Sequence, residues 1–340
     1  MSATSWQDVY VVETGAYLPP RIATDTAIAD GRFDANLRDS VGIDSVTVSS
    51  SESAPEMAAH AALQVMRAIG DTVAEVGMLI HACGWDQQHL AVPLFVQDVL
   101  GVEIPMAFEI RQGCAAGLTA LALAANELCR ATTPETVLVT AADRFIEPAF
   151  DRWRSASGMI HGDAGASALL SRTGGFAKII AYSANSAPEY EIAGRMDALT
   201  GAPGATLNAL AVKNAIIART GRDAFIAEMA KRTSDTISEV LDAAAVELSR
   251  IDHIVVPNMG RRTLESFFFS PLGADWDKST WAFGRTVGHA GAADTILGLH
   301  HLAQSGALEP GQRVLAFAIG TGFCWSSAIF EIAETPRPRR

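Results

Sequence analysis

Apolar residues in this chain gather in short runs, most of them separated by longer segments in which apolar positions recur at helical spacing. The short runs are rich in Val, Ile, Leu and Ala, a composition typical of buried strands. They lie at residues 9–12, 76–82, 136–140, 166–170, 177–182, 253–256, 314–319 and 326–332. Strands that alternate with helices in this way predict an α/β protein built of stacked layers.

Three helical segments stand out between these strands. Residues 54–68 carry apolar side chains at helical spacing, and residues 224–248 form a long amphipathic pattern with charges on one face. Residues 118–129 are apolar nearly all round. A helix without a polar face has to be buried, so this third segment predicts a helix enclosed between sheets.

A weak internal repeat suggests that the fold is duplicated. The segment from Gly113 to Leu118 reads GCAAGL, and the segment from Gly288 to Ala293 reads GHAGAA. Each is a glycine, a reactive side chain and then small residues that open an apolar helix. Chance similarity is the alternative, because Ala and Gly are abundant here. We place the boundary near Gly175, giving halves at 1–174 and 175–340, and we expect a long loop at 184–208.

Length and composition narrow the class of protein. The chain has 340 residues, of which 49% are hydrophobic, and no apolar run is long enough to span a membrane. The first residues lack the pattern of a signal peptide, so we expect a cytoplasmic protein without membrane contact.

With 26 basic and 38 acidic residues the net charge is −12, which argues against nucleic acid as a partner. An anionic coenzyme or carrier would need a local basic patch, for which Arg261, Arg262, Arg152 and Arg154 are candidates.

Cys114 is the strongest candidate for chemistry. It follows Gly113 and precedes the apolar helix, whose N-terminus would favour a thiolate. A buried cysteine that only packs is the alternative. The other cysteines (Cys83, Cys129 and Cys324) form no CxxC pair with it and are read as free thiols at packing positions. No spacing of His, Cys and carboxylates indicates a metal site.

Five short motifs, in order along nearly the whole chain, resemble the β-ketoacyl-ACP synthase III family of the thiolase fold. They are TGAYLPPR from Thr14, VGI from Val41, QGCAAG from Gln112, GDAGA from Gly162 and GTGFCW from Gly320. The resemblance implies a five-layered αβαβα fold made of two similar halves, and a homodimer. It also implies that the segment HLAVP, from His89 to Pro93, reaches the partner's acyl pocket, with Val92 at the substrate.

The chain departs from this family at two catalytic positions. Condensing members use Cys, His and Asn, and their His and Asn stabilise the enolate that forms when a malonyl group loses CO₂. Here Asn258 stands where the His should be, and His289 stands where the Asn should be. Asp294 follows His289 by five residues, which is not a same-face helical spacing. It therefore reaches His289 only if His289 precedes the helix.

The resulting set of Cys, His and Asp suits acyl transfer to a heteroatom. Cys114 would attack an acyl thioester, His289 would act as general base, and Asp294 would orient the imidazole. The backbone N–H groups of Cys114 and Thr321 would form the oxyanion hole. Asn258 is either a passive replacement or a substrate ligand. No cofactor is expected, since CoA or phosphopantetheine enters as the thioester substrate.

The lead hypothesis is therefore an acyltransferase that moves an acyl group from acyl-CoA or acyl carrier protein to a small-molecule acceptor. The pattern resembles acyltransferase offshoots of the family in polyketide and glycoside tailoring, such as the cervimycin malonyltransferase type. Two alternatives stay open. One is a starter-unit condensing enzyme of the daunorubicin type, and the other is a non-catalytic subunit of a heterodimeric synthase, against which the intact Cys114 motif counts.

Overall fold

The computed structural model describes residues 3–70, 76–85, 91–130, 135–156, 158–194 and 209–336. Most of the predicted loop at 184–208, the segment 86–90 with His89, and the tail from 337 lie outside these ranges. The predicted strands all appear, as β2 (Tyr10–Tyr17), β5 (Val76–Cys83), β7 (Thr136–Asp143), β8 (Ala164–Ser171), β9 (Ala177–Ser186), β10 (His253–Val255), β11 (Arg313–Gly320) and β12 (Cys324–Ile332). The sequence pattern did not reveal β6 (Met106–Arg111), the strand that leads to Cys114.

The predicted helices appear as α3 (Ala54–Ile69), α5 (Ala116–Arg130) and α7 (Arg222–Ala244). Helix α3 starts sharply because Ser53 and Glu56 form a reciprocal capping box. The chain also forms α11 (Asp294–Ser305), which follows His289. Further elements are β1 (Thr4–Ser5), β3 (Arg21–Ala23), β4 (Ser45–Thr47), α1 (Thr24–Ala29), α2 (Arg38–Val41), α4 (Val92–Leu100), α6 (Ala209–Thr220), α8 (Arg261–Leu264), α9 (Ser270–Leu272) and α10 (Trp281–Gly284).

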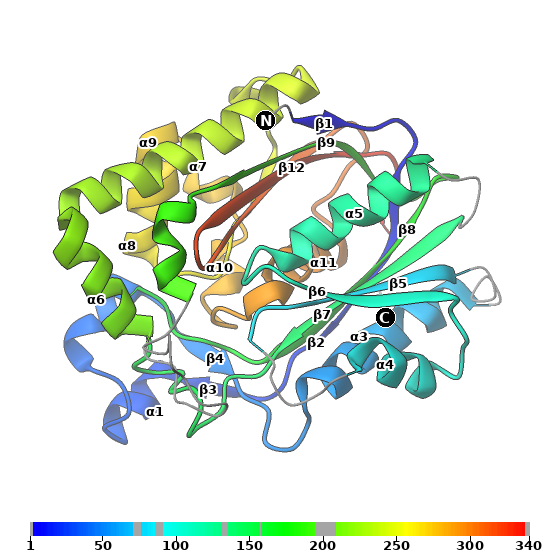
Figure 1. Cartoon of the computed structure of the whole chain (residues 1–340). Helices are drawn as coiled ribbons and strands as arrows, with labels where there is room; N and C mark the ends of the chain where they lie inside the picture. The colour runs from blue at the N-terminus through cyan, green and yellow to red at the C-terminus, as the bar shows by residue number, and fades with distance from the viewer. Residues whose placement is uncertain are drawn as a thin grey trace.

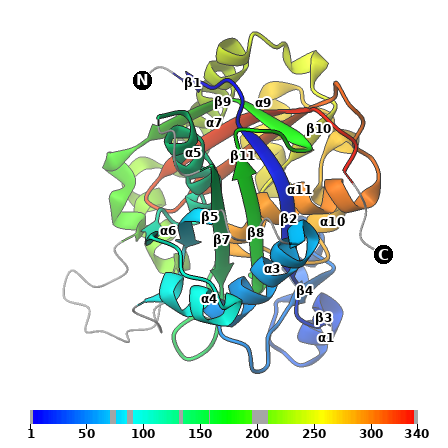
Figure 2. The ribbon, with the colours of Figure 1, turned by 90° about the vertical axis from the view of Figure 1, so that its right-hand side faces the viewer.

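The main strands form two stacked sheets that are joined at one edge. The first has the order β6-β5-β7-β8-β2 and the second the order β10-β11-β12-β9, and β2 meets β9 through only two residue pairs. Helices α5 and α11 lie between the sheets, α3 and α4 cover the outer face of the first, and α7 covers the second (Figure 1). Figure 2 shows α3 lying across β2, β8 and β7. The layers are those of the thiolase fold.

The two halves repeat one strand order. Numbered within each half, the first sheet reads 3-2-4-5-1. In the second half, Ser279 forms an isolated bridge to Ile254 on β10. If Ser279 is counted as the third strand of that half, the second sheet has the same order. The similarity of GCAAGL and GHAGAA thus corresponds to equivalent places, since each segment precedes a central helix. The proposed boundary after residue 174 falls in the turn between β8 and β9.

Small residues allow the central layer to be thin. Helix α5 buries mainly Ala, Gly and Leu between the sheets. Gly117 in its first turn touches the turn before α11, and a Cβ on Gly117 would lie 2.1 Å from the carbonyl oxygen of Ala292. The starts of α5 and α11 therefore meet backbone to backbone, and this contact brings Cys114 and His289 to the same point.

Candidate active site

Cys114 lies in the short link between β6 and α5. Strand β6 ends at Arg111, α5 begins at Ala116, and the cysteine between them is half-buried. Helix α5 is 15 residues long, and its N-terminal end carries partial positive charge and unpaired N–H groups. Cys114 therefore lies at the mouth of the apolar helix, as the sequence predicted.

His289 faces this sulfur. Its Nε2 lies 2.9 Å from Sγ of Cys114, and the imidazole is 1% exposed. The backbone of His289 is fixed on both sides, because its N–H donates to the carbonyl of Ile160 at 2.8 Å and its own carbonyl accepts from Gly162 at 3.0 Å. The ring is thereby held against the nucleophile by a segment of the other half.

Asp294 completes the set from the start of α11. Its Oδ2 lies 2.5 Å from Nδ1 of His289. A 3-10 turn (Gly291–Ala293) separates His289 from the helix, so His289 precedes the helix as the five-residue spacing requires. The backbone N–H of Ala290 donates to Oδ1 of Asp294 at 2.8 Å and closes the turn. The structure thus brings together the three residues predicted for acyl transfer.

Asn258 lies behind Asp294. Its backbone N–H donates to Oδ2 of Asp294 at 2.8 Å, and its side-chain Nδ2 donates to Oδ1 at 2.9 Å. The side chain is 2% exposed. The sequence predicted a substrate contact or a passive role for Asn258. In the structure its side-chain amide nitrogen and backbone N–H hold the carboxylate that contacts His289, and a substrate contact stays a prediction.

Charge is concentrated on the cysteine–histidine pair. Burial by itself would lower the pKa of His289, but the facing Cys114 sulfur and the Asp294 carboxylate raise that pKa well above its usual value. The imidazole beside Cys114 is therefore favoured in its protonated form. A second imidazole, that of His161, lies with its ring centre 5.4 Å from the ring of His289. Burial, the charge of His289 and Arg152 lower the pKa of His161 well below its usual value, so it stays neutral.

The glycine loop between β11 and β12 packs on the cysteine turn. A Cβ on Gly113 would lie 2.9 Å from the backbone nitrogen of Thr321, so this nitrogen lies beside the nucleophile segment, and the oxyanion hole of Cys114 and Thr321 stays a prediction. In the same loop, Sγ of Cys324 donates to the carbonyl of Gln112 at 3.6 Å. Burial raises the pKa of Cys324 to about 11, so this neighbouring cysteine remains a thiol.

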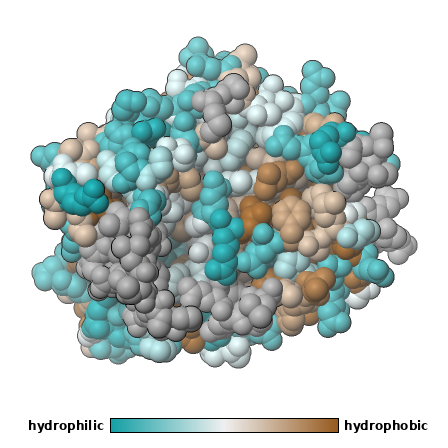
Figure 3. All heavy atoms as spheres, viewed as in Figure 1, coloured by the Kyte–Doolittle hydropathy of each residue, from teal (hydrophilic) through white to brown (hydrophobic). Residues whose placement is uncertain are grey.

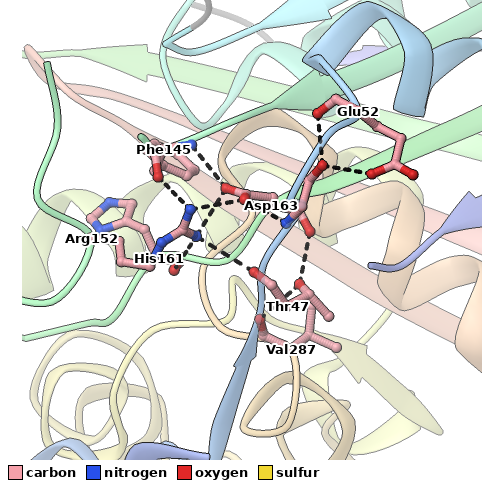
Figure 4. A network of polar contacts seen from close by, with 8 residues as sticks. Thr47, Glu52, Phe145, Arg152, His161, Asp163 and Val287 are labelled. Carbon is pink, nitrogen blue, oxygen red and sulfur yellow. Dashed lines mark hydrogen bonds and ion pairs between the residues drawn. The ribbon is translucent and has the colours of Figure 1, made fainter. Parts of the chain in front are cut away.

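A buried ion pair supports the segment that holds His289. The guanidinium of Arg152 donates to both carboxylate oxygens of Asp163, at 2.9 and 2.8 Å, and also to the carbonyl of His161 (Figure 4). Arg152 is 9% exposed. It was a candidate for binding an anionic coenzyme, but its donors are committed to Asp163 and backbone carbonyls. Arg152 therefore stabilises the site and does not contribute to a surface patch.

Val92 does not fit its predicted role. It is the first residue of α4, is 1% exposed, and belongs to the hydrophobic cluster under α3. A side chain that reaches a partner's pocket has to project from its own subunit. The sequence prediction placed Val92 there because HLAVP matches a family loop, whereas its apolar side chain is buried in its own core.

A cavity of about 490 Å³ is lined by residues of both halves. It is lined by Leu37, Ser40, Val41, Gly158, Asn214, Ile217, Arg222, Phe225, Ile226, Arg262, Thr263, Ser266 and Phe267. Phe225 also contacts Phe323 of the glycine loop, with ring centres 6.0 Å apart. Two cations, Arg222 and Arg262, thus line this cavity, and one lining residue, Phe225, contacts the glycine loop. Arg261 does not line it and instead stacks on Trp276 and Trp281.

Two further residues lie at the site, Asp143, which was not predicted from the sequence, and His161, for which the sequence favoured a structural or solvated role. Asp143 ends β7 and is fully buried, and His161 lies beside His289. A carboxylate at the end of a buried strand was the available signal for Asp143. Among the described residues, no group of three His, Cys, Asp or Glu has an arrangement that could hold a metal ion.

These layers, with Cys114 facing His289 where the two halves meet, are those of a thiolase-fold transferase. Models of 3-oxoacyl-[acyl-carrier-protein] synthase III match residues 108–188, and models of its C-terminal part match residues 241–332. The structure of ChlB3, described as an acyltransferase, is 30% identical to this chain. It superimposes with a TM-score of 0.90 over 96% of this chain and 98% of ChlB3. The chain therefore belongs to the 3-oxoacyl-ACP synthase III family, whose members act on acyl thioesters.

More distant relatives have the same fold. The β-ketoacyl-ACP synthase III of Psychromonas ingrahamii is 27% identical over 326 residues, covering 94% of this chain and 98% of the relative. The 3-oxoacyl-ACP synthase III of Xanthomonas oryzae is 17% identical with a TM-score of 0.79, covering 96% of this chain and all of that protein. OleA of Xanthomonas campestris is 18% identical with a TM-score of 0.74 and covers 96% of this chain and 99% of OleA. None of the helices described in this chain is long and apolar enough to cross a membrane.

Proposed function

We propose that this protein is an acyltransferase that carries an acyl group on Cys114, from a CoA or carrier-protein thioester to a hydroxyl or thiol of a small molecule of secondary metabolism. The observation that carries the proposal is the continuous contact from Sγ of Cys114 through both ring nitrogens of His289 to Asp294, at 2.9 and 2.5 Å. The 30% identity to ChlB3, described as an acyltransferase, supports it. The residue pattern, which resembles that of the cervimycin malonyltransferase type, supports it as well.

The first step forms the acyl-enzyme. The thiolate of Cys114 attacks the thioester carbonyl, and the N–H groups of Cys114 and Thr321 stabilise the oxyanion. When the carbon–sulfur bond to the pantetheine breaks, the imidazolium of His289 gives its proton to the leaving thiolate. Within this proposal, the cavity with Arg222 and Arg262 would receive the phosphate of the pantetheine donor, because guanidinium groups bind phosphate through paired N–H donors.

The second step transfers the acyl group. Neutral His289 takes the proton of the acceptor hydroxyl or thiol while the oxygen or sulfur of that group attacks the acyl carbon. The bond to Sγ then breaks and Cys114 returns to the thiolate, with His289 again protonated. Asp294 stabilises the imidazolium throughout, and Asn258 holds Asp294. No step requires the loss of CO₂.

Intact mass spectrometry tests this directly. Incubation with acetyl-CoA, malonyl-CoA and their acyl carrier protein thioesters should add one acyl mass to the wild-type chain and none to Cys114→Ala. The adduct should disappear on addition of an alcohol or thiol acceptor, with the malonyl mass retained in the product. Absence of an adduct with every donor would contradict the proposal.

Decarboxylative condensation is the second candidate, favoured by the full-length similarity to β-ketoacyl-ACP synthases at 24–27% identity. Condensing members need a His and an Asn that act together on the malonyl thioester. Here the amide of Asn258 donates to Asp294. Release of CO₂ from malonyl-ACP, coupled to chain extension, would establish condensation. Acylation of Cys114 without release of CO₂ would favour acyl transfer over condensation.

We also propose that the protein is a homodimer. Strand β6 lies at the end of the first sheet, and its side chains Met106 and Phe108 are 51% and 37% exposed. On the neighbouring helix α4, Leu94 and Val99 are 63% and 40% exposed. Figure 3 shows apolar side chains gathered on this face. An exposed apolar edge strand favours pairing with another strand, and a second copy supplies an identical edge.

A further inference from the structure

Asp143 has no part in the two steps above, yet it contacts the turn between His289 and Asp294 and also the loop at Gly84, which packs against the Cys114 turn. It ends β7, is fully buried, and lies where the loops after β5 and β6 meet the turn before α11. We propose that Asp143 is a positioning residue that holds the His289–Asp294 turn in register with the Cys114 turn. This proposal depends on the proposed function in one respect, because it assumes that the reaction takes place at these two turns.

The carboxylate of Asp143 joins the two halves through backbone N–H groups. Its Oδ1 accepts from Gly84 at 2.9 Å and from Trp85 at 2.5 Å, both in the loop after β5. Its Oδ2 accepts from Ala292 at 2.8 Å, in the 3-10 turn between His289 and Asp294. One side chain therefore fixes a loop of the first half and the catalytic turn of the second half.

Two glycines, Gly291 and Gly84, let the backbone pack closely against the carboxylate of Asp143. A Cβ on Gly291 would lie 2.1 Å from Oδ2 of Asp143, and Gly291 has a φ of +61°. A Cβ on Gly84 would lie 3.1 Å from the same oxygen and 3.3 Å from the carbonyl carbon of Gly113. Gly113 immediately precedes Cys114. The backbone on either side of the carboxylate thus leads directly to the nucleophile and to its base.

The charge on Asp143 suits this position. Hydrogen bonds from backbone N–H groups to a carboxylate are stronger than those to a neutral acceptor. The Ala292 N–H belongs to the turn that opens α11, where helix geometry leaves N–H groups to be satisfied from outside the helix. Asp294 satisfies the Ala290 N–H of this turn while orienting His289, and Asp143 satisfies the Ala292 N–H while fixing where the turn sits.

Asp143→Asn is the discriminating variant. Its amide oxygen can still accept from Gly84 and Trp85, but its NH₂ group then faces the N–H of Ala292, donor against donor. We expect the variant to fold and the turn to move away from the nucleophile. The rate of Cys114 alkylation by iodoacetamide at pH 6 should fall at least 10-fold, and the pH midpoint of alkylation should rise. Cysteine-resolved mass spectrometry reports Cys114 separately from the other thiols.

Thr140→Val is the matched control. Thr140 lies three residues earlier on β7, is fully buried, and bonds Nδ1 of His81 at 2.9 Å. It should lower the unfolding midpoint without moving the alkylation profile. Gly84→Ala is a second test, because it presses on the carboxylate from the other side. It should shift the profile in the same direction as Asp143→Asn, by a smaller amount.

The outcomes separate this proposal from the proposed function. If Asp143→Asn lowers the unfolding midpoint but leaves the alkylation profile of Cys114 unchanged, Asp143 is only structural and the proposal is wrong. If Asp143→Asn does not fold, an unshifted profile for folded Gly84→Ala overturns it. Alkylation needs no acyl substrate, so a shifted profile would support the positioning role even if Cys114 accepted no acyl group.

Discussion

The α-carbon of Gly117 and the carbonyl oxygen of Ala292 leave no room for a methyl group between the two central helices. A Cβ on Gly117 would lie 2.1 Å from that oxygen. Gly117 follows the nucleophile by three residues, and Ala292 follows the base by three. The distance between Cys114 and His289 is therefore set by backbone contact, which is less adaptable than contact between side chains.

Gly117→Ala should damage both stability and reactivity. The methyl group has to push the starts of α5 and α11 apart, and overpacking of this kind costs about 1–3 kcal/mol of unfolding free energy. We also expect slower acylation of Cys114, because His289 moves with the turn. Urea denaturation and the acylation rate measure the two effects. Ala122→Ser on α5, a small buried change away from this contact, serves as control.

Asp294→Asn should show how much catalysis depends on the orientation of His289, because the variant keeps the imidazole and removes the carboxylate that holds it. An amide in place of the carboxylate stabilises the imidazolium less and favours the other tautomer, so acyl transfer should fall roughly 10²–10⁴-fold. Because Asp294 helps to raise the pKa of His289, the variant should also need a higher pH for Cys114 to react. The pH profile of alkylation measures this. Asp235→Asn, at an exposed ion pair with Lys231, should change neither quantity.

His81 should make the protein sensitive to acid. It is fully buried, and burial with the nearby charge of Arg111 lowers its pKa from 6.5 to about 3. Between these values the unfolded chain binds a proton that the folded chain does not, so stability falls as pH decreases through this range, by about 1.4 kcal/mol per pH unit for one proton.

His81→Gln keeps a partner for Thr140 and removes the titrating group. The free energy of unfolding, measured in urea from pH 6.5 down to pH 4, should then decrease less steeply than in the wild type. His253→Gln, at a half-buried position on β10, should leave the slope closer to that of the wild type. An identical slope in His81→Gln and wild type would show that His81 is not held neutral.

Phe108→Lys should break the proposed dimer. A lysine at the middle of the exposed β6 edge places a charge where two apolar strands would pair. Light scattering after size-exclusion chromatography should change from the mass of two chains to that of one. Ile146→Lys, at a residue of similar exposure in the loop after β7, is the control and should remain a dimer. A wild-type chain that is monomeric at micromolar concentration would contradict the proposal.

The layered fold and the meeting of Cys114, His289 and Asp294 could be predicted from the sequence, but the contacts around them could not. Buried strands show as continuous apolar runs, whereas β6 is half-exposed at an edge and shows no such run. The set of Cys114, His289 and Asp294 follows from motif positions. The role of Asn258 depends on a hydrogen bond to a residue 36 positions away, and that of Asp143 on one to a residue 149 positions away. Such distant pairings exist only after the halves have packed.

The nucleophile and its base lie 175 residues apart in sequence and come from different halves of the duplicated fold. Neither half by itself contains a complete site. During synthesis and refolding, Cys114 therefore has no facing imidazole until the second half has docked, and the proposed acyl transfer has no base before then. The contact between Cys114 and His289 is thus formed only when assembly is finished.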